Sequence, residues 1–185
     1  RVDADRFVPA RWELLPEGRY MWGSVQTVRG CPKHCSFCSV WRTDGQKPRQ
    51  RQVDAVINEI VDLRRRGLRF IALADDNFYP VTLADIAMAE RQRNLIRIDE
   101  LKRLRAERFE LMARLAELPS DMVFFTQITM EAAEDVAFLD AMRRANIKGA
   151  PVGGEAVTPP GFESGFKGFK GNGDALVQPL RHFPQ

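Results

Sequence analysis

The sequence lacks a long apolar run. Every apolar stretch falls well short of the roughly 20 residues that a membrane-spanning helix needs. A basic segment followed by an apolar one, as in a secretory signal peptide, is also missing from the first residues. We therefore expect no membrane span and a cytoplasmic location.

A strong excess of one charge is also missing. Lys and Arg together number 28 and Asp and Glu 25, which gives a net charge of +3. The basic residues do not gather into one stripe, as the footprint of a nucleic-acid-binding protein would require. We therefore expect no nucleic-acid partner.

Cysteine and histidine are scarce. Only three cysteines occur in 185 residues, and all three lie between positions 31 and 38. An odd, tightly clustered set of cysteines is a poor disulfide framework. In a reducing compartment, such clustered thiols usually bind a metal.

The length fits one domain with a full hydrophobic core. Because the chain begins with Arg1 and its last part shows no regular pattern, we expect it to be a piece of a longer protein. We predict a lead-in segment over residues 1–22, a folded domain over 23–158 and an irregular Gly- and Pro-rich tail over 159–185.

Apolar periodicity predicts alternating strands and helices. Short β-branched or apolar runs predict strands at 24–28, 70–74, 122–128 and 147–152. Helical spacing predicts helices at 53–66, at 83–118 with a break near 94–99, and at 131–145, where Ala132, Val136, Leu139 and Met142 should point inward. This order predicts an α/β chain with a parallel sheet and right-handed crossovers.

The three cysteines have the spacing C-x3-C-x2-C, as Cys31, Cys35 and Cys38. Three thiolates from one short loop can hold three corners of a [4Fe–4S] cluster and leave the fourth iron open to a small molecule. The alternative is a zinc site with His34 as fourth ligand, in a non-catalytic α/β scaffold that binds a protein partner. Because His34 is adjacent to Cys35, simultaneous tetrahedral ligation by both is awkward.

Polar residues follow the later predicted strands. Asp75, Asp76 and Asn77 come after the second strand, Gln127 ends the third, and Glu155 follows the fourth. Ligands of parallel α/β sheets collect at the carboxyl ends of the strands, so we predict that the first four of these residues bind a cofactor. The aspartates could instead cap a helix or form a solvated turn, and Gln127 could be a structural hydrogen-bonding residue.

The cysteine spacing, with the aromatic Phe37 directly before the last cysteine, resembles the signature of the radical S-adenosylmethionine (SAM) superfamily. From about residue 5 to 157 the chain resembles the radical SAM part of cobalamin-binding-domain radical SAM proteins, most strongly over 22–41 and 72–80. This resemblance implies a partial, TIM-like (β/α) barrel of which about four β/α units are present.

The same resemblance implies roles for individual residues. Phe37 would lie against the adenine of SAM. Asp75, Asp76 and Asn77 stand where the family has a Gly-Gly-Glu type segment that contacts the methionine amine. Glu155, within a G-x-E-[SA] pattern, would help to hold the ribose or methionine part of SAM.

The resemblance also implies a reaction. A radical SAM enzyme cleaves SAM reductively at its [4Fe–4S] cluster to form a 5′-deoxyadenosyl radical, with a reductant such as flavodoxin or ferredoxin. The expected reaction is cobalamin-dependent methyl transfer to an unactivated carbon of a small-molecule substrate. The 185 residues contain no D-x-H-x-x-G motif, so cobalamin would be bound through a domain absent from this chain.

Overall fold

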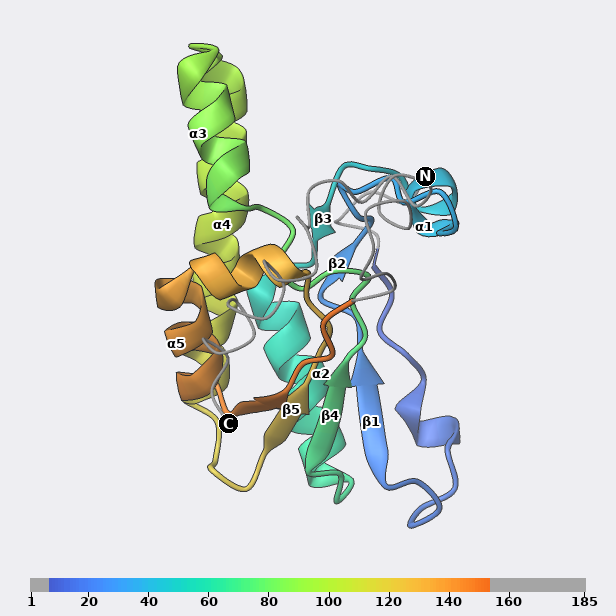
Figure 1. Cartoon of the computed structure of the whole chain (residues 1–185). Coiled ribbons are helices and arrows are strands. Elements are labelled where there is room, and N and C mark those ends of the chain that lie inside the picture. Colours follow the sequence, from blue (N-terminus) through green and yellow to red (C-terminus); the bar gives the residue numbers. More distant parts are fainter. Residues whose placement is uncertain (1–6, 154–185) are drawn as a thin grey trace.

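The computed structural model describes residues 7–153 (Figure 1). Its main sheet has four parallel strands in the order β1-β4-β5-β6, which are Trp22–Val25, Phe70–Leu73, Val123–Phe125 and Ile147–Gly149. The prediction of an α/β fold with a parallel sheet is confirmed. Because the strands are parallel, their carboxyl ends meet at one edge of the sheet.

The remaining elements are helices and a small second sheet. The helices are η2 (Trp12–Leu14), α1 (Val40–Thr43), α2 (Val53–Arg65), α3 (Leu83–Arg91), α4 (Leu95–Ala116), η3 (Met130–Glu134) and α5 (Val136–Arg144). The second sheet pairs β2 (Val28–Arg29) with β3 (Arg49–Gln50) in antiparallel fashion. This sheet lies beside α1 and the cysteine loop (Figure 1).

The core lies on one face of the main sheet. Alternate strand residues, such as Val25, Ile71 and Phe124, are buried in one apolar cluster with side chains of α2, α4 and α5. On the opposite face Trp22, Phe70 and Phe125 keep between 37% and 54% of their surface exposed. All the long packing helices therefore cover the same side of the sheet.

Several elements differ from the sequence-based boundaries. The strand expected at 24–28 is split into β1 and β2, because the backbone N–H groups of Thr27 and Val28 donate to a side chain and not to a neighbouring strand. The break in the long helical segment lies at 92–94, earlier than predicted. There Arg93 has a positive φ of 52° and the side chain of Asn94 caps α4.

The helix predicted at 131–145 begins instead as the 3-10 helix η3. A 3-10 helix has three residues per turn, so it shifts the phase of the residues that follow. Ala132, Leu139 and Met142 are buried as expected, but Val136 is 65% exposed. The prediction that Val136 points inward is therefore wrong.

Helices α3 and α4 form a hairpin whose tip projects beyond the sheet (Figure 1). Thr82 and Asp85 form a capping box at the start of α3. The hairpin has its own small apolar cluster, built around Val81, Ala89 and Leu101. Within residues 7–153 no helix is long and apolar enough to cross a membrane.

Candidate functional site

A cavity of about 330 Å³ opens at the carboxyl edge of the parallel sheet. Segments that follow all four strands line it: the three cysteines after β1, Asp76 after β4, Gln127 and Thr129 after β5, and residues 151–153 after β6. Its volume lies within the range of small-molecule and cofactor sites. The structure thus brings the three cysteines together with Phe37, Asp76 and Gln127 from distant segments.

The cysteine loop is held at several points. The N–H of Gly30 donates to Oδ2 of Asp76 at 3.0 Å, and the N–H of Cys31 donates to the carbonyl of Gly45 at 3.1 Å. Nε1 of Trp41 donates to the carbonyl of Cys35 at 3.0 Å. Gly30 has a φ of 91°, and a Cβ there would lie 2.9 Å from the Gly45 oxygen, so this position favours glycine.

The donor set suits an iron–sulfur cluster. Cys31, Cys35 and Cys38 are free thiols of intermediate exposure that line the same cavity. Burial raises the pKa of the Cys31 thiol, and the nearby thiols and Asp76 raise it further. A bound cluster would oppose this rise, because coordination to a metal deprotonates a thiol.

A mononuclear zinc site is not favoured by the geometry. In the described part of the chain, no group of three His, Cys, Asp or Glu side chains is arranged to hold a single metal ion. Each thiolate of a cluster binds a different iron, so cluster ligands need not converge on one point. The ring of His34 packs edge-on against Trp41, with 6.3 Å between their centroids.

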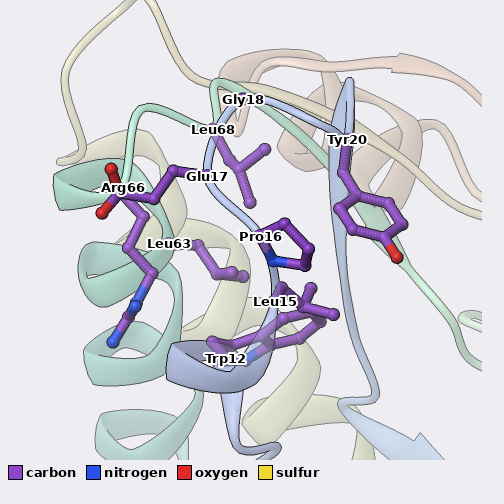
Figure 2. Close-up of a pocket in the computed structure, with 9 residues that line it drawn as sticks. All are labelled: Trp12, Leu15, Pro16, Glu17, Gly18, Tyr20, Leu63, Arg66 and Leu68. Atoms are coloured by element: carbon purple, nitrogen blue, oxygen red, sulfur yellow. The ribbon is translucent and has the colours of Figure 1, made fainter.

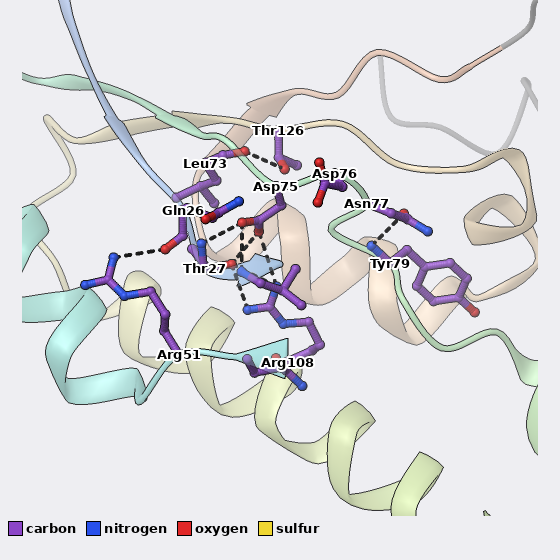
Figure 3. Close-up of polar contacts among 12 residues, drawn as sticks. Gln26, Thr27, Arg51, Leu73, Asp75, Asp76, Asn77, Tyr79, Arg108 and Thr126 are labelled. Carbon is purple, nitrogen blue, oxygen red and sulfur yellow. Dashed lines mark hydrogen bonds and ion pairs between the residues drawn. The ribbon is translucent and has the colours of Figure 1, made fainter. Parts of the chain in front are cut away.

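Asp75 lies in the interior and not in the cavity (Figure 3). Its carboxylate accepts hydrogen bonds from the N–H groups of Thr27, at 2.5 Å, and Val28, at 2.8 Å, and from the Thr27 hydroxyl. Burial raises the pKa of the Asp75 carboxyl, whereas Arg108 and these donors oppose the rise. The side chain of Asp75 therefore does not reach the cavity, and its contact with the amine of SAM stays a prediction.

Arg108 of α4 completes this buried network (Figure 3). Its Nη1 lies 3.4 Å from Oδ2 of Asp75, and both Nη atoms donate to the hydroxyl of Thr27 at 2.9 Å. The guanidinium also lies over the ring of Phe78, 4.7 Å from its centroid. The sequence analysis missed Arg108, although it interrupts an apolar stripe of α4 between Leu104 and Leu111.

The two neighbours of Asp75 differ from each other. Asp76 lines the cavity, where it accepts the hydrogen bond from Gly30. Asn77 is 1% exposed, and its Oδ1 accepts from the N–H of Tyr79 at 3.1 Å. Asn77 therefore lies in the interior beside Asp75, and its contact with SAM stays a prediction.

Gln127 and Phe37 both line the cavity. Nε2 of Gln127 donates to the carbonyls of Asp75, at 2.8 Å, and Asp76, at 3.3 Å, so its amide joins the ends of β5 and β4. Phe37 is 60% exposed at the cavity. Glu155 and the tail from residue 159 lie outside the described residues, and the role of Glu155 stays a prediction.

An ion pair beside the cysteines was not anticipated from the sequence. Nζ of Lys33, in the cysteine loop, lies 2.6 Å from Oε1 of Glu131 in η3. Lys33 also lines the cavity. The available signal was the position of Lys33 between the first two cysteines, together with an acidic residue soon after a strand end.

A second hollow lies at the opposite, amino edge of the sheet (Figure 2). It is bordered by the segment 12–20 together with Leu63, Arg66 and Leu68, and its volume is about 30 Å³. This is about a tenth of the roughly 300 Å³ at which the range of small-molecule sites begins. The hollow is too small for a cofactor, so the cavity at the cysteines remains the candidate site.

A parallel α/β sheet with a three-cysteine loop at its carboxyl edge defines a class of cluster-binding enzyme domains. A family model described as "Radical SAM superfamily" matches residues 25–159. The chain belongs to this superfamily, whose members are enzymes that use a [4Fe–4S] cluster and SAM. The expected family, enzyme class and these two cofactors are thereby confirmed.

Curated relatives match parts of the chain. Hopanoid C-2 methylase of Rhodopseudomonas palustris (strain TIE-1) is 33% identical over 79 residues, which cover 42% of this chain and 15% of that protein. A tRNA-2-methylthio-N(6)-dimethylallyladenosine synthase of Pseudomonas aeruginosa (strain UCBPP-PA14) is 31% identical over 150 residues, covering 72% of this chain and 32% of the synthase. The chain therefore spans less than half the length of either relative.

Two solved structures share the fold. The radical SAM methyltransferase TsrM from Kitasatospora setae, with cobalamin and a [4Fe–4S] cluster bound, has a TM-score of 0.57 and 18% identity, over 86% of this chain and 28% of that one. The cobalamin-dependent radical enzyme OxsB, with aqua-cobalamin and SAM bound, has a TM-score of 0.60 and 18% identity, over 86% and 21%. The likeness confirms a partial TIM-like barrel with four parallel strands.

Proposed function

We propose that this chain is the catalytic part of a radical SAM enzyme that cleaves SAM reductively and serves cobalamin-dependent methyl transfer to an unactivated carbon of a small molecule. The observation that carries the proposal is the single cavity in which three free thiols meet Asp76, Gln127 and Phe37. The methyltransferases among the relatives support the choice of methyl transfer.

Cys31, Cys35 and Cys38 would hold the cluster. Held there, the cluster would supply one-electron reductive cleavage of SAM to methionine and a hydrogen-abstracting 5′-deoxyadenosyl radical, with the electron from a donor such as flavodoxin or ferredoxin. Cobalamin would be supplied by a domain outside these 185 residues.

The chain's own residues bind and orient SAM. Asp76 presents a carboxylate to the cavity and can accept hydrogen bonds from the ammonium of the methionine part. Phe37 offers an exposed ring on which the adenine can stack. Gln127 holds the backbone that carries Asp76, so it positions that carboxylate.

Asp75 and Arg108 have a supporting role in this proposal. Through Thr27 and Val28 they fix the chain between the end of β1 and the cysteine loop. A fixed loop base keeps the thiols and Asp76 in a constant arrangement, which catalysis by positioned cofactors requires.

Anaerobic reconstitution with iron and sulfide tests the cluster. We expect four irons per chain, thiolate-to-iron absorption, and formation of 5′-deoxyadenosine and methionine from SAM after reduction with dithionite. Cys35→Ala should abolish all three, and His34→Ala should retain them. A colourless protein that binds one zinc ion, and that loses it with His34→Ala, would support the zinc scaffold instead.

A second measurement tests the methyl transfer. With the full-length protein, cobalamin that carries no methyl group, and SAM labelled in its methyl group, we expect the labelled methyl group on a carbon of the product. Incorporation of a sulfur-linked methyl group would point to methylthiolation and would contradict the proposed reaction, while leaving SAM cleavage in place.

A further inference from the structure

The ion pair of Lys33 with Glu131 lies beside the cysteine cavity, and the proposed function gives it no role. The two side chains are only 17% and 16% exposed, and 2.6 Å separates their charged atoms. Among the described residues neither carboxylate oxygen of Glu131 accepts a hydrogen bond. The ammonium of Lys33 is therefore the charge that balances this buried carboxylate.

The pair joins two segments that are far apart in the sequence. Lys33 belongs to the cysteine loop, and Glu131 belongs to η3, which follows β5. The position of the ammonium is thus set by the end of a core strand and not by the loop alone. Because both groups are largely withdrawn from water, their fields are screened less than those of surface charges.

We propose that Lys33 and Glu131 together set the reduction potential of the cluster, an inference that rests on the proposed function. Lys33 places a cation at the wall that the three thiols share. A cation stabilises the electron that the cluster gains on reduction, and the carboxylate of Glu131 offsets this effect. Reduction of the cluster adds one electron from an external reductant and breaks no bond.

The two single substitutions should shift the potential in opposite directions. Lys33→Met keeps most of the length of the side chain but removes the cation, which leaves the negative charge of Glu131 without compensation, so the potential falls. Glu131→Gln removes the anion, so the ammonium is no longer offset and the potential rises. The double variant should lie between the two single variants.

The experiment is a redox titration of the reconstituted protein, followed by the electron paramagnetic resonance signal of the reduced cluster. Lys47→Met is the matched control. Lys47 forms a similar ion pair with Glu100, at 2.7 Å, but it is 69% exposed and does not line the cavity. Because solvent screens this pair, the control should leave the potential unchanged.

Opposite shifts in the two variants, with none in the control, support the inference. Shifts of the same sign, or no shift in either variant, overturn it while the cluster and the proposed function stand. If Lys33→Met does not retain a cluster, the reduction potential of Glu131→Gln tests the inference alone. A higher potential than in the unaltered protein supports it, and an equal or lower potential overturns it. If the unaltered protein takes up no cluster, the proposed function and this inference fail together.

Discussion

Arg108 of α4 and Asp75, which follows β4, form an ion pair in the interior, with 3.4 Å between Nη1 and Oδ2. Both residues are at most 2% exposed. Through the hydroxyl and N–H of Thr27, the pair links the helix layer to the chain that leads into the cysteine loop. A buried charge without its partner is costly, so each member depends on the other.

Asp75→Asn should destabilise the fold strongly. The amide removes the charge opposite Arg108 and replaces one acceptor oxygen by a donor that faces N–H groups. We expect the free energy of unfolding to fall by about 3–5 kcal/mol, measured by urea denaturation. Asp121→Asn is the control, since Asp121 pairs with Arg64 and Arg69 at the surface, where solvent screens the ion pairs, and its loss should change the free energy of unfolding little. Equal losses in both variants would contradict this account.

Gly30→Ala should disturb the base of the cysteine loop. Gly30 has a φ of 91°, and a Cβ would lie 2.9 Å from the Gly45 oxygen and 3.1 Å from that of Lys47. We expect a loss of about 2–3 kcal/mol in unfolding free energy and less iron bound after reconstitution. Gly67→Ala shares the positive φ, at 92°, but meets nothing within 4 Å. In Gly67→Ala the free energy of unfolding should fall by about 1 kcal/mol and the iron content should be unchanged. An equal loss of iron in both variants would contradict the prediction.

Asp135 should make stability depend on acid pH. Burial by itself raises the pKa of its carboxyl, but hydrogen bonds from Arg105 and Tyr79 outweigh this effect and hold the pKa below its ordinary value. The resulting stabilisation is present above the unfolded pKa of about 3.9 and is lost as the pH falls through the folded value. Asp135→Asn should therefore cost about 2 kcal/mol near neutral pH and less at about pH 3.

Urea titrations at the two pH values measure this difference. The side chain of Asp135 also accepts a hydrogen bond from the N–H of Phe138 at 3.1 Å, which caps α5, and asparagine is able to keep that cap. The expected change thus comes from the charge. If the difference in free energy of unfolding between the variant and the unaltered protein is the same at both pH values, the charge of Asp135 does not contribute to stability.

Phe37→Ala should weaken SAM binding without loss of the cluster. Removal of a ring that stacks on a base costs about 1–3 kcal/mol, or roughly 5- to 150-fold in the dissociation constant. Equilibrium dialysis of SAM against the reconstituted protein measures it. Phe125→Ala is the matched control, because Phe125 is also partly exposed, at 38%, but does not line the cavity. Unchanged SAM affinity in Phe37→Ala would remove the proposed stacking role.

Local patterns in the sequence were sufficient for much of the fold. The helix at Val53–Arg65 was predicted to within one residue, because its apolar spacing and Gly67, with a φ of 92°, both act locally. The predicted strand boundary was wrong where a side chain accepts the hydrogen bonds of backbone N–H groups that a continuous strand would use for pairing. Asp75 accepts hydrogen bonds from the N–H groups of Thr27 and Val28, so that β1 ends at Val25 and does not continue to residue 28. Residues 48 and 47 positions apart cannot be matched by a local pattern.

The candidate site shows the same division. The spacing of Cys31, Cys35 and Cys38 identified the cluster loop, because three thiols on one short loop share a ligand whatever the fold. The adjacent residues Asp75 and Asp76 could not be told apart in the sequence. One lies in the interior and the other lines the cavity.

The sequence by itself determined the alternation of strands and helices, the cysteine loop and the family. Periodicity and ligand spacing are properties of neighbouring residues, so they are readable along the chain. Only the tertiary structure decided that Arg108 pairs with Asp75 and Lys33 with Glu131. A buried charge needs an opposite charge close in space, and only the packing of α4 and η3 against the strand ends determines which residue provides it.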